Sequence, residues 1–91
     1  MKILGFDYSM KYSNDSGYVG RCVPDELSIH VEKNMPIQRK YETIIHEVIE
    51  AVNIHNQLGL RHSTITALAV AMHQFLSDNG VNLSPLMKEL K

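Results

Sequence analysis

The stretch Thr43-Ile44-Ile45-His46-Glu47-Val48-Ile49-Glu50-Ala51-Val52-Asn53 decides the expected fold and chemistry of this chain. Its apolar residues recur every three or four positions, which predicts an amphipathic helix with one broad apolar face. The stretch also matches all but the last position of HExxH, in which two histidines bind zinc and the glutamate is the general base. Glu50 replaces the second histidine and gives HExxE. Because glutamate is a competent zinc ligand, the replacement does not by itself remove a metal site.

Helical spacing places His46, Glu50 and Asn53 on one face, because they stand at positions i, i+4 and i+7. Glu47 projects about 100° around the helix from His46, so it can reach a metal-bound water without ligating the metal. Zinc would lower the pKa of that water toward about 7, and Glu47 would accept its proton. Asn53 is either a residue that supports a metal ligand or a surface amide, and the pattern slightly favours the surface amide.

A catalytic zinc site needs a third protein ligand and one open position. The connection between Asn56 and Arg61 is short, so a second helix should return antiparallel to the first. His62 would begin that helix beside Glu50 and is the preferred third ligand. His73 ranks second, because it lies about 16 Å further along the same face. His55 ranks third, because it lies on the opposite side of the first helix.

The surrounding sequence predicts an α+β fold, with a small antiparallel N-terminal sheet packed on two antiparallel helices. Before Asn34, alternating apolar residues and turn-forming residues indicate short strands. After Pro36, apolar residues recur every three or four positions, which indicates helices. Ser63 or Thr64 can cap the second helix. The predicted strands are Ile3–Leu4, Tyr8–Tyr12, Tyr18–Val23 and Leu27–Glu32. The predicted helices run from Ile37 to Asn56, from the Ser63 or Thr64 cap to about Asp78, and from Pro85 to Leu90.

The bulk composition narrows the class of protein. Ninety-one residues are expected to form one domain over residues 1–91. The formal net charge of −1 argues against non-specific nucleic-acid binding, since there is no basic surplus to neutralise phosphates. The single cysteine, Cys22, excludes an internal disulfide and fits a reducing cytoplasm. No apolar run approaches the roughly 20 residues of a membrane span, so no membrane partner is expected.

The order of these motifs resembles small phage- and prophage-encoded zincin-like proteins related to the ImmA/IrrE metallopeptidase group. The resemblance covers nearly the whole chain. It rests on segments in both halves of the sequence: Met1–Gly5, Gly20–Cys22, Leu27–Val31, Gln38–Glu47, and Leu68–Leu76 followed by Asp78–Asn79.

This resemblance implies a minimal zincin-like domain with an edge strand along the active cleft and a metal-bearing helix. By position, His46 corresponds to the first zinc ligand, Glu47 to the general base and Glu50 to the second ligand. The strand around Ile29 corresponds to the one that pairs with an extended peptide substrate. Thr66 stands where relatives with an intact HExxH carry an acidic third ligand, and His62, one turn earlier, can compensate.

Three functions follow as hypotheses. The first is a zinc-dependent metallopeptidase-like protein that acts on a protein or peptide in the cytoplasm, which is the host cytoplasm if the protein is phage-encoded. Zinc would be bound by His46, Glu50 and His62, with Glu47 as base. The second is a catalytically inactive zincin-derived module that binds a host or phage protein. The third is an unrelated α+β protein in which His46 and Glu50 are surface residues. An exposed edge strand in so small a sheet is compatible with a homodimer.

Overall fold

The computed structural model describes residues 1–13 and 19–88 and has the expected α+β organisation, with strands followed by helices. The predicted division into N-terminal strands and C-terminal helices is confirmed, with two differences: Phe6–Asp7 forms an additional short strand, and the described part of the predicted C-terminal helix is a 3₁₀ turn over Ser84–Met87. Tyr18 in the third predicted strand, and the end of the predicted C-terminal helix, lie outside the described residues. The elements are β1 (Lys2–Ile3), β2 (Phe6–Asp7), β3 (Ser9–Ser13), β4 (Gly20–Val23), the 3₁₀ turn η1 (Pro24–Glu26), β5 (Ser28–Glu32), α1 (Ile37–His55), α2 (His62–Asp78) and the 3₁₀ turn η2 (Ser84–Met87).

The strands form a two-stranded hairpin and a separate three-stranded sheet. β1 and β2 are antiparallel and turn at Leu4 and Gly5, which both have positive φ angles. In the larger sheet the strand order is β3-β5-β4. β4 is antiparallel to β5, with Cys22 opposite Ile29, whereas β3 is parallel to β5, with Met10 opposite Ile29. The larger sheet is therefore mixed, and the expectation of an entirely antiparallel sheet is wrong in this respect.

The central position of β5 corrects one expectation about substrate binding. Ile29 lies in the middle strand, and both edges of that strand are already paired, with β3 and β4. A strand with two partners has no free backbone edge for a peptide to join. The expectation that the strand around Ile29 pairs with a substrate is therefore wrong. Of the two edge strands of the larger sheet, β4 contacts α1 directly.

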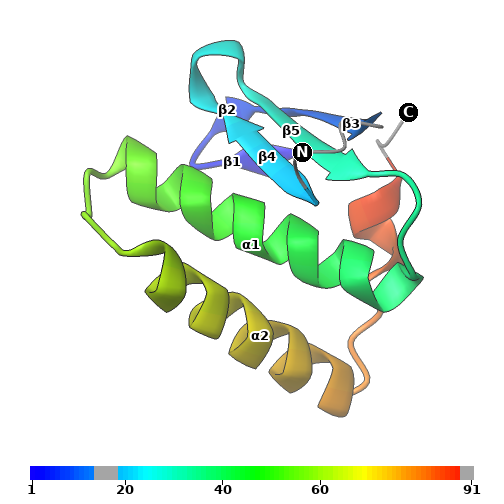
Figure 1. Cartoon of the computed structure of the whole chain (residues 1–91). Coiled ribbons are helices and arrows are strands. Elements are labelled where there is room, and N and C mark those ends of the chain that lie inside the picture. Colours follow the sequence, from blue (N-terminus) through cyan, green and yellow to red (C-terminus); the bar gives the residue numbers. More distant parts are fainter. Residues whose placement is uncertain (14–18, 89–91) are drawn as a thin grey trace.

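The elements are arranged in three layers, with the sheet on one side of α1 and α2 on the other (Figure 1). The first helix is consequently in contact with both other layers. Ile44 and Ala51 are fully buried, and Ile45 is nearly so. The fully buried Ile29 and Val31 of β5 belong to the same core as Ile44. This core holds α1 against the sheet, and so fixes the side of α1 that carries His46 and Glu50.

The first helix starts at Ile37, as predicted, and ends at His55, one residue before the predicted end. Pro36 immediately precedes α1, where its fixed φ suits the start of a helix. The second helix begins at His62, before either predicted cap, and no side chain caps it. The predictions of Ser63 and Thr64 as caps are therefore wrong. Both residues lie inside the first turn of α2, and His62 becomes its first residue.

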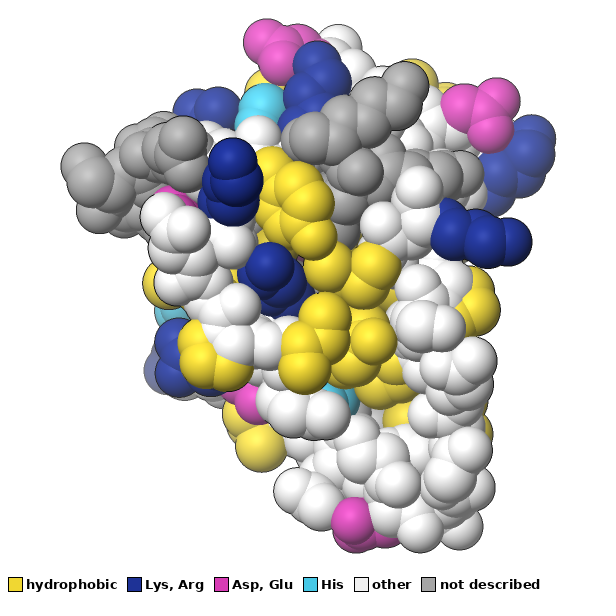
Figure 2. All heavy atoms as spheres, turned by 90° about the vertical axis from the view of Figure 1, so that its right-hand side faces the viewer, with side chains coloured by type: hydrophobic (Ala, Val, Ile, Leu, Met, Phe, Trp, Pro, Cys, Tyr) yellow, Lys and Arg dark blue, Asp and Glu magenta, His cyan; other side chains and the backbone are white. Residues whose placement is uncertain are grey.

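The C-terminal part of the described chain closes one end of the helical layers. Leu83 is 9% exposed, and Leu86 and Met87 of η2 pack against the core. Apolar side chains gather over the middle of the face on which η2 lies (Figure 2). A cleft of about 310 Å³ separates α1, α2 and η2 and is lined by apolar residues: Ile44, Ile45, Val48, Ile49, Met72, Leu76, Leu83 and Leu86. Within residues 1–13 and 19–88, no helix combines the length and apolar character that crossing a membrane requires.

Candidate metal centre

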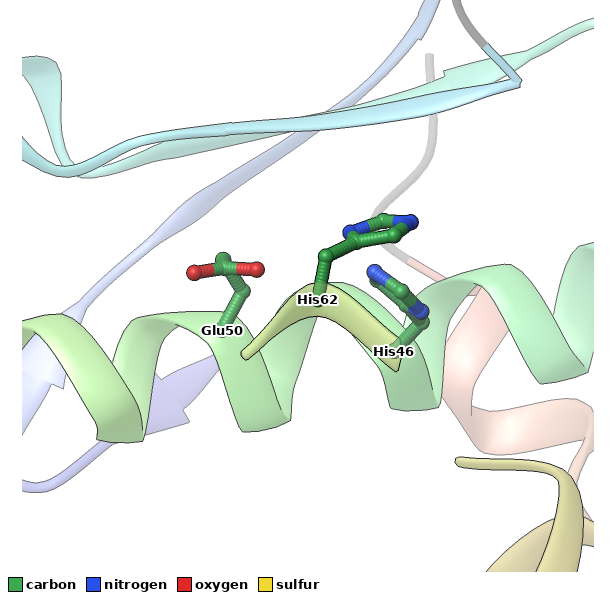
Figure 3. A group of neighbouring side chains, drawn as sticks. All are labelled: His46, Glu50 and His62. Carbon is green, nitrogen blue, oxygen red and sulfur yellow. The ribbon is translucent and has the colours of Figure 1, made fainter. Parts of the chain in front are cut away.

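Three side chains converge at the point where α2 begins beside the middle of α1. One ligand atom each of His46, Glu50 and His62 lies within 4.8 Å of the other two. His46 and Glu50 project from α1 and His62 from the first turn of α2, all on the same side (Figure 3). The structure therefore brings together the three residues that the sequence predicted as metal ligands.

Helical spacing and a short connection produce this convergence. His46 and Glu50 share a face of α1 because they stand one turn apart. The chain then reverses between Asn56 and Arg61, using positive φ angles at Gln57 and Gly59. Because the reversal is short, the first residue of α2 is placed opposite the last half of α1, within reach of Glu50.

The three ligand atoms, which lie within 4.8 Å of one another, are close enough to surround one ion after small side-chain movements. Ligand atoms at about 2.0–2.1 Å from zinc in a tetrahedral site lie about 3.4 Å from one another. Small side-chain rotations of the half-buried His46 and the exposed His62 would bring the set to this spacing. The imidazole rings of His46 and His62 already lie 4.9 Å apart between centroids, tilted by 56°. The donor set of two imidazoles and one carboxylate, with a position left open, fits zinc.

The protonation state of His46 suits metal binding. Its pKa lies below the ordinary value, chiefly because burial disfavours the charged ring and also because His62 is close. The carboxylates of Glu50 and Glu42 oppose this shift but do not outweigh it. Neutral imidazole is the form that binds a metal, so the environment favours the binding-competent form of His46 near neutral pH.

Glu47 is the buried carboxyl group of the site. Its side chain is only 6% exposed. Burial raises the pKa of Glu47 from 4.5 to about 7, and the nearby charge of Glu50 contributes further. A general base is most effective when its pKa lies near the working pH. Glu47 therefore has the environment that the HExxE interpretation requires of it.

The strand β4 covers Glu47 at unusually short range through Gly20. A β-carbon on Gly20 would lie 3.1 Å from Oε2 of Glu47 and would overlap Cγ2 of Thr43. Only glycine permits the strand to approach α1 this closely. The spacing of apolar residues did not identify Gly20 as part of the site. A glycine inside a predicted strand can mark the close approach of another segment, and this signal could have identified it.

A cleft of about 460 Å³ opens over the site. It is bounded by β4 and the residue before it, by α1 and by the first turns of α2. Thr66, which stands where an acidic ligand was expected from the resemblance, lies on its wall one turn after His62. The lining residues are Val19, Gly20, Arg39, Glu42, Thr43, His46, Glu47, His62 and Thr66. Arg39, Glu42 and Thr43 were not predicted as site residues.

The two alternative third ligands have other partners. The Nε2 atom of His73 is 3.0 Å from Oε1 of Gln38, and its Nδ1 atom is 3.9 Å from Oε2 of Glu42. His55 stacks on the ring of Phe6, and its Nε2 atom is 2.5 Å from the hydroxyl oxygen of Tyr8. Both histidines thus contribute to packing between elements, and neither belongs to the group around His46.

Cys22 lies near the site but is a poor ligand. Burial raises the pKa of its thiol to about 11, and the charge of Glu47 adds to the effect. A hydrogen bond with Tyr8 acts in the opposite direction but is outweighed. Only the thiolate binds metals strongly, so a protonated, half-buried Cys22 acts as a packing residue.

Comparison with protein-family models, with curated protein sequences and with solved structures finds no match to this chain. The interpretation of the site therefore rests on its own geometry and chemistry.

Proposed function

We propose that this chain is a zinc-dependent metallopeptidase-like protein in which His46, Glu50 and His62 bind the ion and Glu47 is the general base. The convergence of the three ligand atoms within 4.8 Å of one another carries the proposal. The buried Glu47 beside them adds a carboxyl group that could act as the general base. Zinc bound there would polarise the carbonyl group of the substrate and lower the pKa of a bound water molecule.

In the proposed reaction, Glu47 accepts the proton of the attacking water and holds it for transfer to the leaving amine. The burial that raises the pKa of Glu47 makes its carboxylate a stronger base than an exposed glutamate. Burial also separates this carboxylate from bulk water, so the proton stays close to the reacting atoms. Gly20 leaves room for this carboxyl group beneath β4.

The proposed substrate is an extended segment of a protein or peptide lying along β4. Val19 and Gly20 form one side of the cleft that also contains His46 and His62. A peptide could join the edge of β4 by backbone hydrogen bonds, which are independent of its sequence. In this proposal β4, and not the strand around Ile29, pairs with the peptide. We place this activity in the cytoplasm.

A second candidate function is a binding module in which the metal has only a structural role. The ligands come from two helices, so a bound ion would fasten the first turn of α2 to the middle of α1. A small α+β chain gains stability from such a cross-link without any catalysis. In this alternative the cleft above the metal would hold a protein partner that is not cleaved.

A cleavage assay distinguishes the two candidates. Purified zinc-loaded protein would be incubated with a library of short peptides, and new termini would be identified by mass spectrometry. The peptidase proposal predicts cleavage by the wild type, and none by Glu47→Gln with its zinc content unchanged. Equal cleavage by the two proteins would overturn the role of Glu47. Zinc bound by both proteins, with cleavage by neither, would favour the binding module.

A further inference from the structure

Asn53 connects the two helices of the candidate centre through both ends of its side-chain amide. The backbone N–H of Leu60 donates to Oδ1 of Asn53 over 2.9 Å. The Nδ2 group of Asn53 donates to Oε1 of Glu50 over 3.5 Å. Leu60 belongs to the connection between α1 and α2, just before His62. A single half-buried amide thus contacts one ligand and the segment that leads to another.

The orientation of this amide follows from its partners. A backbone N–H can only donate, so the oxygen of Asn53 must face Leu60. The amide nitrogen is then the group that faces Glu50, whose carboxylate can only accept. At 3.5 Å this contact is at the long end of hydrogen-bonding distance, and it leaves lone pairs on both oxygens of Glu50 for a metal ion. The contact therefore bears on the orientation of the Glu50 carboxylate and does not decide which oxygen would bind the ion.

We propose that Asn53 is a positioning residue of the zinc centre, which sets Glu50 of α1 relative to His62 of α2. This inference rests on the proposed function, because it presumes that the three ligands bind zinc. Polar groups that orient ligands from outside the first coordination sphere commonly alter metal affinity by about 10-fold to 100-fold. Asn53 acts on two of the three ligands, directly on Glu50 and through Leu60 on His62.

Asn56 provides a matched control. It is also an asparagine near the end of α1, and its Nδ2 group donates to the carbonyl oxygen of Val52 over 3.2 Å. Asn56 is exposed and is not one of the residues of the candidate centre. Replacement by alanine removes side-chain hydrogen bonds near the same helix end in both cases, two at position 53 and one at position 56. Only the change at position 53 should reach the metal ligands.

The test is the zinc dissociation constant of the full chain, measured by competition with a chromogenic chelator, for wild type, Asn53→Ala and Asn56→Ala. We expect Asn53→Ala to weaken zinc binding by about 10-fold or more, and Asn56→Ala to stay within about 2-fold of wild type. Thermal unfolding of the metal-free proteins would verify that both variants fold. If Asn53→Ala does not fold, Asn53→Ser, which keeps a polar group on α1, replaces it with the same expectation.

The outcomes separate this inference from the proposed function. Zinc binding by wild type and by Asn53→Ala with equal affinity would overturn the positioning role and leave the metal site intact. A lowered melting temperature in Asn53→Ala without a change in zinc affinity would reduce Asn53 to a loop anchor and also overturn it. Absence of zinc binding by the wild type would overturn the proposed function, and the positioning role with it.

Discussion

The imidazole rings of His46 and His62 lie 4.9 Å apart between centroids, although one belongs to the middle of α1 and the other begins α2. The proximity depends on the short reversal between the helices. It brings a second imidazole to the side of α1 where Glu50 stands in place of the second histidine of HExxH. In the proposed site, two histidines and one glutamate would therefore surround the ion.

The first prediction concerns the identity of the third ligand. Replacement of His62 by alanine should weaken zinc binding by more than about 100-fold. That is the largest loss usually caused by removing a residue that only orients a ligand. His73→Ala and His55→Ala should bind zinc with nearly the affinity of the wild type, because their rings contact other elements. Chelator competition on the three variants checks this. Strong loss in His73→Ala, with none in His62→Ala, would contradict the proposed ligand set.

Zinc should also stabilise the fold. An ion that binds only the folded chain adds about 2.7 kcal/mol when its concentration is 100 times the dissociation constant. In a domain of this size that corresponds to a rise in melting temperature of roughly 10–20 °C. A chelator should reverse the rise, and His46→Ala should show neither effect. Identical melting curves for wild type with zinc and with chelator would argue against the site.

Glu47 should make the stability of the metal-free protein depend on pH. Its folded pKa of about 7 exceeds the ordinary value of 4.5, so the folded state binds the proton more tightly than the unfolded state. The contribution of Glu47 to the free energy of unfolding is therefore constant below about pH 4.5. It falls as the pH rises from there to about 7. The full loss corresponds to about 3 kcal/mol.

Glu47→Gln removes this titration and provides the measurement. Denaturant unfolding of the metal-free proteins at pH 5 and pH 8 should show the variant gaining stability over wild type as the pH increases. Comparison between the two proteins cancels the opposite contribution of His46, whose pKa is lowered by burial. A stability difference that stays constant from pH 5 to pH 8 would show that Glu47 has an ordinary pKa.

The close approach of β4 to α1 should make position 20 sensitive to a single methyl group. Gly20→Ala would place a β-carbon against Cγ2 of Thr43 and 3.1 Å from Oε2 of Glu47. Overpacking of this kind typically costs about 1–3 kcal/mol. Thr43→Ser removes the obstructing methyl group, so the double variant should recover part of the loss. Denaturant unfolding of the single and double variants checks this, and a neutral Gly20→Ala would contradict the observed packing.

Local patterns predicted most of the fold and the members of the candidate centre. Helical periodicity located α1 and placed His46 and Glu50 on one face, because that relationship depends only on residue spacing. His62 could be inferred from the length of one connection. The α+β class followed from the change of period near Pro36.

The features that sequence reasoning missed depend on contacts between distant segments. The parallel pairing of β3 with β5 leaves Ile29 in the middle of the sheet, and no local pattern distinguishes a central from an edge strand in so short a run. At Asn53 the sequence pattern favours a surface amide only slightly over a residue that supports a metal ligand, because the bond to Leu60 exists only after the chain reverses. Gly20 acquires its role only when β4 lies against Glu47.

Elemental mass spectrometry of protein purified without a histidine tag tests the central claim most directly. Wild type and His46→Ala would be offered zinc, dialysed and measured in parallel. We expect close to one zinc ion per wild-type chain and almost none in His46→Ala. A wild-type chain without zinc after this treatment, or equal zinc in both proteins, would contradict the assignment of His46, Glu50 and His62 as a metal centre.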